Sequence, residues 1–342
     1  MNARENPTTM PVLVTGGAGY IGSHAVLALK EKGWPVVVVD NLVTGFRSAV
    51  PEDVAFHEVD VGNAAAVADI LRRHDIGAIM HFAGSVVVPE SVQNPLKYYN
   101  NNTANSRNLV EVAVKENVRH FVFSSTAAVY GEPQDSRVSE DSPTVPINPY
   151  GRSKLMTEEM LRDVSKAHDL NHCILRYFNV AGADPLGRTG QSTVGATHLI
   201  KVAIEAALGK RSHIEIFGSD FDTRDGTGVR DYIHVSDLAS AHVLALQALV
   251  GNPLRSMTLN CGYGQGYSVG EVLDAVDKAA GVRVKRVKAP RRAGDPGELV
   301  AKIERIREEL SWHPKRNDLS QIVTDALNWE LRNPKAVKPQ AT

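Results

Sequence analysis

The stretch Met10-Pro-Val-Leu-Val-Thr-Gly-Gly-Ala-Gly-Tyr-Ile-Gly22 decides the fold of this chain. Its first half is a short apolar run of the kind that forms a buried strand. Its second half has the spacing Gly16-x-x-Gly19-x-x-Gly22, and Gly17 adds a fourth glycine. Glycine is needed where the backbone takes a positive φ or approaches a phosphate closely. The apolar spacing of residues 20–32 predicts a helix whose N-terminus offers free N–H groups to that phosphate.

A second apolar strand, residues 36–39, leads directly into Asp40. Strand, glycine turn, helix, strand and acidic residue form the βαβ unit that binds dinucleotides. The Asp40 carboxylate is suited to the ribose hydroxyls and would repel a 2′-phosphate, so we predict NAD rather than NADP. Asp60 ends a third strand, predicted over 54–60, and two interpretations of it stay open: contact with the adenine, or a solvated turn residue.

Strands and helices continue to alternate as far as Phe178. Apolar strands between amphipathic helices predict an α/β fold with a doubly wound parallel sheet that is covered on both faces. We expect helices at 66–74, 102–116 and 150–168, and strands at 78–82, 120–124 and 173–176.

The amino-acid composition changes after Val180, where loop-forming residues become frequent. We therefore expect a cofactor domain over 10–180 and a smaller mixed α/β lobe, built from 181–230 and 251–332, that binds the substrate. The segment 231–250 is expected to return to the main sheet, 282–287 to form an antiparallel edge strand, and 333–342 to be a tail.

The composition limits the class of protein. The chain has 342 residues, a net charge of −1 and 43% hydrophobic residues, which favours neither nucleic acid nor an anionic membrane as a partner. Residues 1–9 lack the apolar centre of a signal peptide, and Cys173 and Cys261 fit a reducing compartment, so the cytoplasm is the expected location. No metal site is expected, because His168 and His172 have no evident third ligand.

Tyr150 and Lys154 lie four residues apart on a predicted helix, so both side chains project from one face. A nearby ammonium group favours the phenolate and lowers the pKa of the phenol, which is ordinarily about 10. Such a phenol beside a dinucleotide suggests hydride transfer coupled to removal of a hydroxyl proton.

Several motifs of the chain resemble the extended branch of the short-chain dehydrogenase/reductase superfamily, a Rossmann-like fold: Thr15 to His24, Asp40-Asn-Leu42, His81-Phe-Ala-Gly84, Ser124-Ser-Thr126, Val129-Tyr-Gly131 and Tyr150-Gly-Arg-Ser-Lys154. Other segments are similar to the UDP-glucose (UDP-galactose) 4-epimerase family: Arg176-Tyr-Phe-Asn179, Ile216-Phe-Gly218, Asp225 to Val235, and Arg291-Arg-Ala-Gly-Asp295. The resemblance extends from about residue 10 to about residue 332.

This resemblance implies an isomerase that interconverts UDP-galactose and UDP-glucose, with NAD retained through the cycle. Tyr150 takes the proton of the sugar 4-hydroxyl while hydride leaves C4, the 4-keto sugar turns, and the hydride returns to its other face. Lys154 would lower the pKa of Tyr150, and Thr126 would hydrogen-bond to the phenol and to the 4-hydroxyl.

The resemblance also implies two sets of contact residues. Those assigned to the cofactor are Gly16, Gly19, Tyr20, Ile21, Gly22, Asp40, Asn41, Asp60, Val61, Phe82, Ala83, Gly84, Asn101, Ser124, Tyr150, Lys154 and Phe178. Those assigned to the UDP-sugar are Thr126, Tyr150, Asn179, His198, Leu199, Ile216, Phe217, Arg230, Arg292, Asp295 and Leu299. Relatives are usually homodimers, which here implies contacts through 102–116 and 150–168.

Two positions depart from the family pattern. Val86 stands where Lys is frequent, which bears on how tightly NAD is retained. Leu299 stands where Tyr restricts the pocket to plain hexoses and a small residue admits N-acetylhexosamines, so both substrate classes stay open. Whether the pathway is galactose use or supply of polysaccharide precursors also stays open.

Other functions remain as alternatives. They are a 4-epimerase of UDP-N-acetylglucosamine, UDP-xylose or UDP-glucuronate, and a non-catalytic NAD-binding regulator. A 4,6-dehydratase is disfavoured, because Ala127-Ala128 stands where that group carries an acidic residue. A regulator is disfavoured because both Tyr150 and Lys154 are present.

Overall fold

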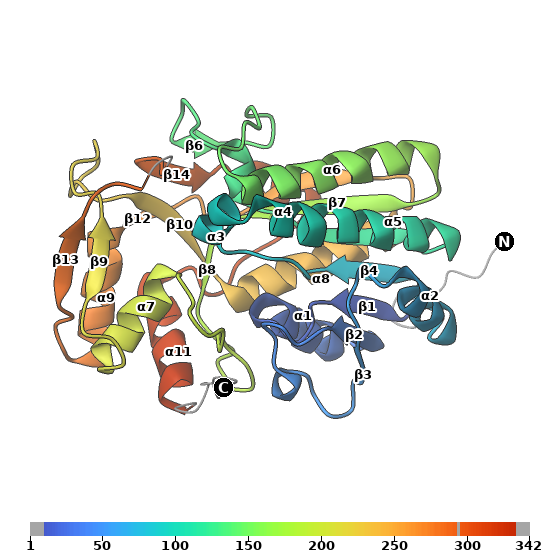
Figure 1. Cartoon of the computed structure of the whole chain (residues 1–342), viewed down its shortest axis with the longest axis horizontal. Helices are drawn as coiled ribbons and strands as arrows, with labels where there is room; N and C mark the ends of the chain where they lie inside the picture. The colour runs from blue at the N-terminus through green and yellow to red at the C-terminus, as the bar shows by residue number, and fades with distance from the viewer. Residues whose placement is uncertain (1–9, 293–294, 333–342) are drawn as a thin grey trace.

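The computed structural model describes residues 10–292 and 295–332, so the predicted tail 333–342 and the polar segment 1–9 lie outside the described residues. A seven-stranded, fully parallel sheet forms the larger lobe, with strand order β11-β7-β5-β4-β1-β2-β3 (Figure 1). Its strands are β1 (Val12–Thr15), β2 (Val36–Asp40), β3 (Ala55–Glu58), β4 (Ala78–His81), β5 (His120–Ser124), β7 (Asn171–Tyr177) and β11 (Met257–Cys261).

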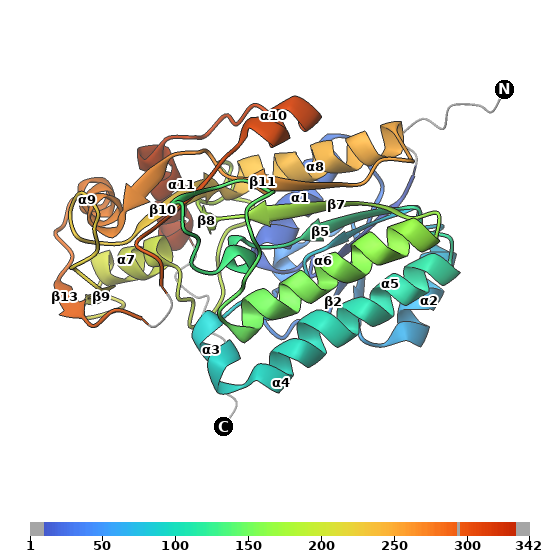
Figure 2. The same ribbon diagram turned by 90° about the horizontal axis from the view of Figure 1, so that it is seen from above.

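Helices cover both faces of this sheet, as Figure 2 shows from above. Alternate residues of β1 point to opposite faces: Val12 and Val14 join one buried cluster and Leu13 joins another. The first face is covered by α1 (Tyr20–Glu31) and α8 (Val235–Gly251), and the second by α2 (Ala64–Arg73), α5 (Asn105–Lys115) and α6 (Pro149–Ala167). The predicted doubly wound α/β sheet is therefore confirmed.

Short helical segments lie at the rim of the sheet. They are α3 (Val88–Gln93), α4 (Pro95–Tyr98), the π-helical turn Tyr99–Ala104, and the 3-10 turns Arg47–Ala49 and Ala127–Tyr130. The helix expected at 102–116 thus begins as a π-helical turn and becomes α-helical at Asn105.

The smaller lobe contains two further sheets. One has the order β12-β10-β14-β6, with β8 also paired to β10, and the other pairs β13 with β9. Their strands are β6 (Arg137–Val138), β8 (Asn179–Ala181), β9 (Ile214–Phe217), β10 (Val229–His234), β12 (Gly266–Ser268), β13 (Arg286–Ala289) and β14 (Glu298–Ala301). The helices are α7 (Leu199–Ala207), α9 (Val269–Ala280), α10 (Glu304–Leu310) and α11 (Leu319–Arg332).

Two expectations about this part of the chain were wrong. In the segment 231–250 only helix α8 returns to the main sheet, because β10 pairs with β8, β12 and β14 instead. The seventh strand of the main sheet is β11, which the sequence analysis did not identify. The strand expected at 282–287 is β13, and it runs parallel to β9 rather than antiparallel. Its partner precedes it by two helices, a pairing that local sequence does not specify.

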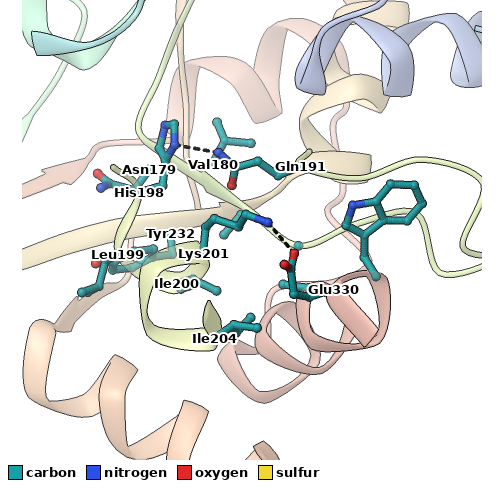
Figure 3. A pocket seen from close by; sticks show the side chains of 14 residues that line it. Asn179, Val180, Gln191, His198, Leu199, Ile200, Lys201, Ile204, Tyr232 and Glu330 are labelled. Carbon is teal, nitrogen blue, oxygen red and sulfur yellow. Dashed lines mark hydrogen bonds and ion pairs between the residues drawn. The ribbon is translucent and has the colours of Figure 1, made fainter. Parts of the chain in front are cut away.

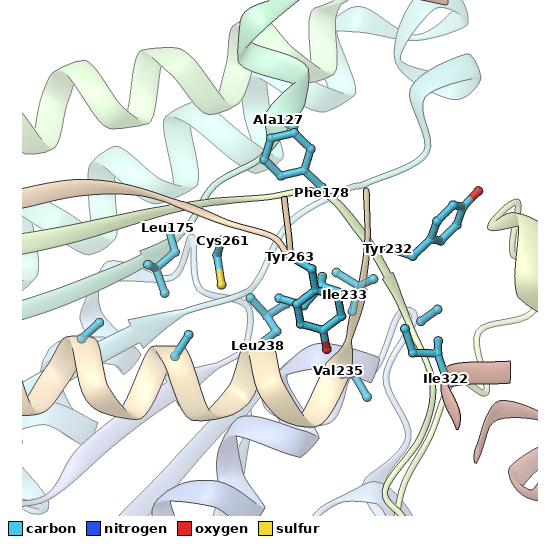
Figure 4. Packing of buried hydrophobic residues seen from close by; sticks show 14 of the residues in the cluster. Ala127, Leu175, Phe178, Tyr232, Ile233, Val235, Leu238, Cys261, Tyr263 and Ile322 are labelled. Atoms are coloured by element: carbon cyan, nitrogen blue, oxygen red, sulfur yellow. The ribbon is translucent and has the colours of Figure 1, made fainter. Parts of the chain in front are cut away.

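The hydrophobic core passes without interruption from one lobe to the other. Figure 4 shows Phe178, at the end of β7, between main-sheet residues such as Leu175 and second-sheet residues such as Ile233. All three belong to one buried cluster, so the two lobes pack as one body around the end of β7. No helix among residues 10–292 and 295–332 is both long and apolar enough to cross a membrane.

Candidate active site

The glycine turn lies at the carboxyl end of β1, where the strand order reverses between β4 and β2. Gly16 has a φ of 69°, and a Cβ there would lie 2.6 Å from the backbone nitrogen of Ala83. A Cβ on Gly22 would lie 2.1 Å from the carbonyl oxygen of Gly16. Helix α1 begins at Tyr20, and no side chain caps its N-terminus at Gly19. The turn thus places backbone without side chains next to a helix end that no side chain caps. This arrangement fits the diphosphate of a dinucleotide.

Asp40 ends β2 at the same edge of the sheet and is 8% exposed. Its carboxylate accepts hydrogen bonds from the backbone N–H of Ala18 at 3.0 Å and of Leu42 at 2.8 Å. The carboxylate is therefore fixed beside the glycine turn, and this position fits the predicted contact with ribose hydroxyls.

Asp60 is exposed and accepts hydrogen bonds from the Asn41 side chain and the Gly62 backbone, both at 2.8 Å. These contacts are those of a turn residue. Val61, which follows it, is 6% exposed and packs in the core under α2 and α5. Contact of Asp60 or Val61 with the adenine stays a prediction.

The turn after β4 carries Phe82, Ala83 and Gly84, and a buried asparagine holds it in place. The Asn102 side chain accepts from the Ser85 N–H at 2.7 Å and donates to the Ser85 carbonyl at 2.9 Å and to Ser153 on α6 at 3.0 Å. Asn101, which was predicted near the cofactor, donates to the Ser85 hydroxyl at 2.9 Å. Asn102 was missed, although it lies in the same Asn101-Asn-Thr103 run.

Tyr150 occupies the first turn of α6, which begins at Pro149 and is capped by the Asn148 side chain. Thr126 caps the 3-10 turn after β5 by accepting from the Ala128 N–H at 3.1 Å. The two segments approach closely, because a Cβ on Gly151 would lie 2.5 Å from the Ala128 carbonyl oxygen. This approach places the Thr126 side chain near the Tyr150 phenol, where it acts to lower the pKa of that phenol.

Lys154 lies one turn further along α6 and is 3% exposed. Its Nζ donates to the Ser124 carbonyl at 3.1 Å and lies 4.9 Å from the centre of the Phe123 ring. Burial lowers the pKa of Lys154 to about 8, while the charge of Glu158 acts to raise it. The Ser124 hydroxyl donates to the Tyr177 hydroxyl at 3.0 Å, which continues this polar edge towards Phe178.

Burial also raises the pKa of Tyr150, and the hydrogen bond with Thr126 lowers it. In the protein alone, burial is the larger of these two effects. A lowered pKa of Tyr150 under the influence of Lys154 is therefore not what this structure shows, and that role of Lys154 stays a prediction.

A cavity of about 730 Å³ opens in the smaller lobe, where its lining residues run from Asn179 to Asp295, and its volume is suited to a small-molecule ligand. Seven of the residues predicted to contact the UDP-sugar line it: Asn179, His198, Leu199, Phe217, Arg230, Arg292 and Asp295. The other four, Thr126, Tyr150, Ile216 and Leu299, are not among its lining residues. Leu299 is 8% exposed and lies opposite Arg230 in the pairing of β14 with β10.

Three cations face the cavity, and each has a partner. Arg230 forms an ion pair with Asp295, which was predicted to contact the same ligand. The Arg292 guanidinium lies 3.7 Å from the centre of the Phe217 ring, a cation–π contact. Arg211, which sequence reasoning missed, forms an ion pair with Glu205. An arginine-rich wall of this kind suits an anionic ligand.

Figure 3 shows a smaller pocket that adjoins this cavity and shares Asn179, His198, Leu199 and Tyr232 with it. The Gln191 amide donates to Nδ1 of His198 at 2.8 Å, so the ring NH of a neutral His198 is on Nε2. Lys201 and Glu330 form a buried ion pair that attaches α7 to α11. The helix end at Leu199 is thereby held at the wall of the cavity.

The sequence profile described as NAD dependent epimerase/dehydratase family matches residues 12–262. The chain belongs to this family. It is 57% identical to the UDP-glucose 4-epimerase of Azospirillum brasilense over 319 residues, which cover 93% of this chain and 91% of that protein. The resemblance drawn from the motifs is confirmed, and the chain is an NAD-dependent epimerase, an isomerase.

Solved structures extend the comparison. A UDP-glucose 4-epimerase from Stenotrophomonas maltophila, solved with NAD and formylated UDP-arabinopyranose, is 39% identical with a TM-score of 0.92, covering 96% of this chain and all of that one. The UDP-Glc/GlcNAc 4-epimerase of Campylobacter jejuni is 50% identical with a TM-score of 0.83, covering 94% of this chain and 99% of that one. The predicted cofactor, NAD, is confirmed by the family and by such neighbours.

Proposed function

We propose that this epimerase interconverts UDP-galactose and UDP-glucose. The observation that carries the proposal is the cavity lined by Arg230 and Arg292, whose wall at Asn179 follows shortly after Tyr177 in the chain. The Tyr177 hydroxyl accepts from Ser124, which precedes Ser125 and Thr126 at the end of β5. A cationic cavity in a chain that also carries a candidate acceptor for a hydroxyl proton suits a nucleoside diphosphate sugar.

In this proposal the role of each residue follows from its position. Tyr150 as phenolate accepts the proton of the sugar 4-hydroxyl, and Thr126 orients both oxygens. Lys154, held by the Ser124 carbonyl, contacts the nicotinamide ribose and stabilises the phenolate electrostatically. When bound, NAD⁺ would accept the hydride from C4 and, in its reduced form, return it to the other face of C4 after the 4-keto sugar has turned about its diphosphate link. Tyr150 then returns the proton to the 4-oxygen.

The cofactor contacts would come from segments before residue 180, and the substrate contacts mainly from 181–230 and 251–332. Arg230 and Arg292 bind the diphosphate, with the backbone N–H groups at Leu199 as further donors. Asp295 accepts from the uridine ribose, Phe217 and Ile216 border the uracil, and Asn179 contacts the phosphate or the sugar. The two free and buried cysteines suit a reducing compartment, which supports a cytoplasmic location.

We propose that the residue at position 299 sets the breadth of substrate choice. The family resemblance implies that Tyr at this position closes the pocket to all but plain hexoses, and Leu299 is smaller than Tyr. The chain is also 50% identical to an epimerase whose name includes both UDP-Glc and UDP-GlcNAc. We propose that UDP-N-acetylgalactosamine is a second, slower substrate.

A substrate panel tests both proposals. Purified protein is incubated with UDP-galactose and, separately, with UDP-N-acetylgalactosamine, with and without added NAD, and products are resolved by chromatography. We expect turnover of both, with UDP-galactose faster. Turnover of UDP-galactose alone would reject the second substrate. No turnover of either by NAD-loaded protein would reject the proposed function and favour the regulator alternative. Stimulation by added NAD would show weak retention, as Val86 suggests.

We also propose that the protein is a homodimer formed through α5 and α6, which lie side by side on the outer face of the sheet (Figure 2). On α6, Met156 is 41% exposed, and nearby Val92 and Leu96 of α3 and α4 are 63% and 76% exposed. Apolar side chains left on a surface are typical of protein contacts. Sedimentation of the full chain should give twice the mass of one chain, whereas a single-chain mass at micromolar concentration would contradict this.

A further inference from the structure

Glu158 is a fully buried carboxylate two turns beyond Tyr150 and one turn beyond Lys154 on the same face of α6. Arg176 of β7 donates to it from Nε at 3.0 Å and from Nη2 at 2.6 Å, and Arg162 donates at 2.7 Å. Burying a charge at this depth is costly unless hydrogen bonds and an opposite charge compensate it. Two arginines provide that compensation, yet a third donor also reaches the carboxylate.

The third donor is Ser125, whose hydroxyl donates to Oε1 of Glu158 at 2.6 Å. Ser125 is fully buried and lies between Ser124, whose carbonyl holds Lys154, and Thr126, whose side chain acts to lower the pKa of Tyr150. The Glu158 carboxylate therefore anchors the chain at the end of β5, where Ser124 and Thr126 flank Ser125.

The far side of Arg176 is fixed as well. Its Nη1 donates to the Tyr130 hydroxyl at 3.1 Å, and the guanidinium lies 5.0 Å from the centre of that ring. The Tyr130 hydroxyl donates in turn to the Asn260 side chain at 2.6 Å, on β11. The ion pair of Glu158 with Arg176 thus joins α6, β7, the 3-10 turn after Thr126 and β11 into one buried network.

We propose that Glu158 is a positioning residue: through Ser125 it fixes the chain segment that carries Thr126 near Tyr150, and its negative charge, one helical turn away, stabilises the ammonium group of Lys154. This inference rests on the proposed function of Tyr150 and Thr126. Rigid placement matters because a displacement of about 1 Å in a reacting group can cost about a hundredfold in rate.

The charged groups around Lys154 determine in which direction the loss of the Glu158 charge shifts the pKa of Lys154. On its own helix it faces Tyr150 and Glu158, and on β4 it faces His81, whose pKa is lowered to about 3 by burial and by Lys154, so His81 is neutral. Glu158 is the anion that raises the pKa of Lys154, with Arg176 and Arg162 beyond it. Removing that negative charge lowers the pKa of Lys154 further, so its proton is lost at lower pH.

Two variants separate the two effects. Ser125→Ala removes one hydroxyl and leaves the charges in place. We expect kcat to fall about tenfold with KM unchanged, because only the placement of a transition-state contact is lost. In the NAD-bound protein, the phenol titration of Tyr150, taken as the absorbance difference from the same variant carrying Tyr150→Phe, should move to higher pH.

Glu158→Gln removes the charge and keeps the shape. We expect kcat to fall by at least the same factor and the alkaline limb of its pH profile to move to lower pH. The control is Asp237→Asn on α8, a 5% exposed carboxylate that accepts from the Tyr263 hydroxyl at 2.7 Å and from backbone N–H groups outside the site. It should lower Tm as Glu158→Gln does, with an unchanged pH profile.

The outcomes are distinct. Wild-type rates and an unmoved phenol titration in Ser125→Ala would overturn the positioning role. A pH profile of Glu158→Gln equal to that of Asp237→Asn would overturn the electrostatic role. Absence of epimerisation by the wild-type protein would reject the proposed function instead, and the phenol titration, which needs no substrate, would still decide the inference.

Discussion

Tyr150→Phe should reduce kcat about a thousandfold, within the range that a positioned proton acceptor contributes. Phenylalanine keeps the ring, which is 7% exposed and packs edge-on against Tyr98 with centroids 6.4 Å apart. It removes only the oxygen that takes the 4-hydroxyl proton. Because the remaining cavity wall is untouched, KM for UDP-galactose and the affinity for NAD should change little. Initial rates and cofactor titrations of the purified variant measure both.

Tyr98→Phe is the matched control for this experiment. Its hydroxyl accepts from the Val87 N–H at 3.0 Å and contacts Glu90 at 2.8 Å, so it takes part in a loop and not in the reacting centre. We expect kcat within about twofold of the wild type, with some loss of stability from the unpaired groups. Equal rates for the two variants would contradict the role of Tyr150 as the base.

Arg230→Ala should raise KM for UDP-galactose about 30- to 100-fold, with a smaller change in kcat. Arg230 is 14% exposed and its ion pair with Asp295 holds the guanidinium at the cavity wall. Its loss removes the diphosphate contact, and it also leaves the Asp295 carboxylate, 35% exposed, facing an anionic ligand. Steady-state kinetics measure KM and kcat, and calorimetry measures the affinity for UDP.

Two further variants sharpen this result. Arg211→Gln removes a cation that lines the same cavity but is paired with Glu205 and is 39% exposed, so KM should rise less than about threefold. The double variant Arg230→Ala with Asp295→Asn should recover part of the lost affinity, because the repelling charge is gone. A KM for Arg230→Ala no higher than that of Arg211→Gln would show that Arg230 does not contact the diphosphate.

Many features of the candidate cofactor site could be predicted from local sequence, because each of them is specified within a few residues. Gly16 to Gly22, Asp40 and the pair of Tyr150 and Lys154 each occupy one turn or one strand end. Parallel strands bring such ends to one edge of the sheet without further information. The motifs also identified the family, which the match of residues 12–262 confirms.

The tertiary structure decided what depended on distant partners. Strand β13 pairs with β9, β11 pairs with β7 in the main sheet, and β10 pairs with β8 outside it. Each of these pairings joins segments that short-range sequence patterns cannot connect. Asn102 and Glu158 carry no motif of their own, and their roles appear only when β4, β5 and β7 meet α6. Burial acts against a local expectation: the neighbouring Lys154 predicts a lowered pKa for Tyr150, whereas desolvation raises the pKa of that phenol in the protein alone, and the role of Lys154 stays a prediction. The sequence alone therefore determined the chemistry that the site can attempt, and packing determined how its groups are held and charged, because desolvation and long-range contacts exist only in the folded chain.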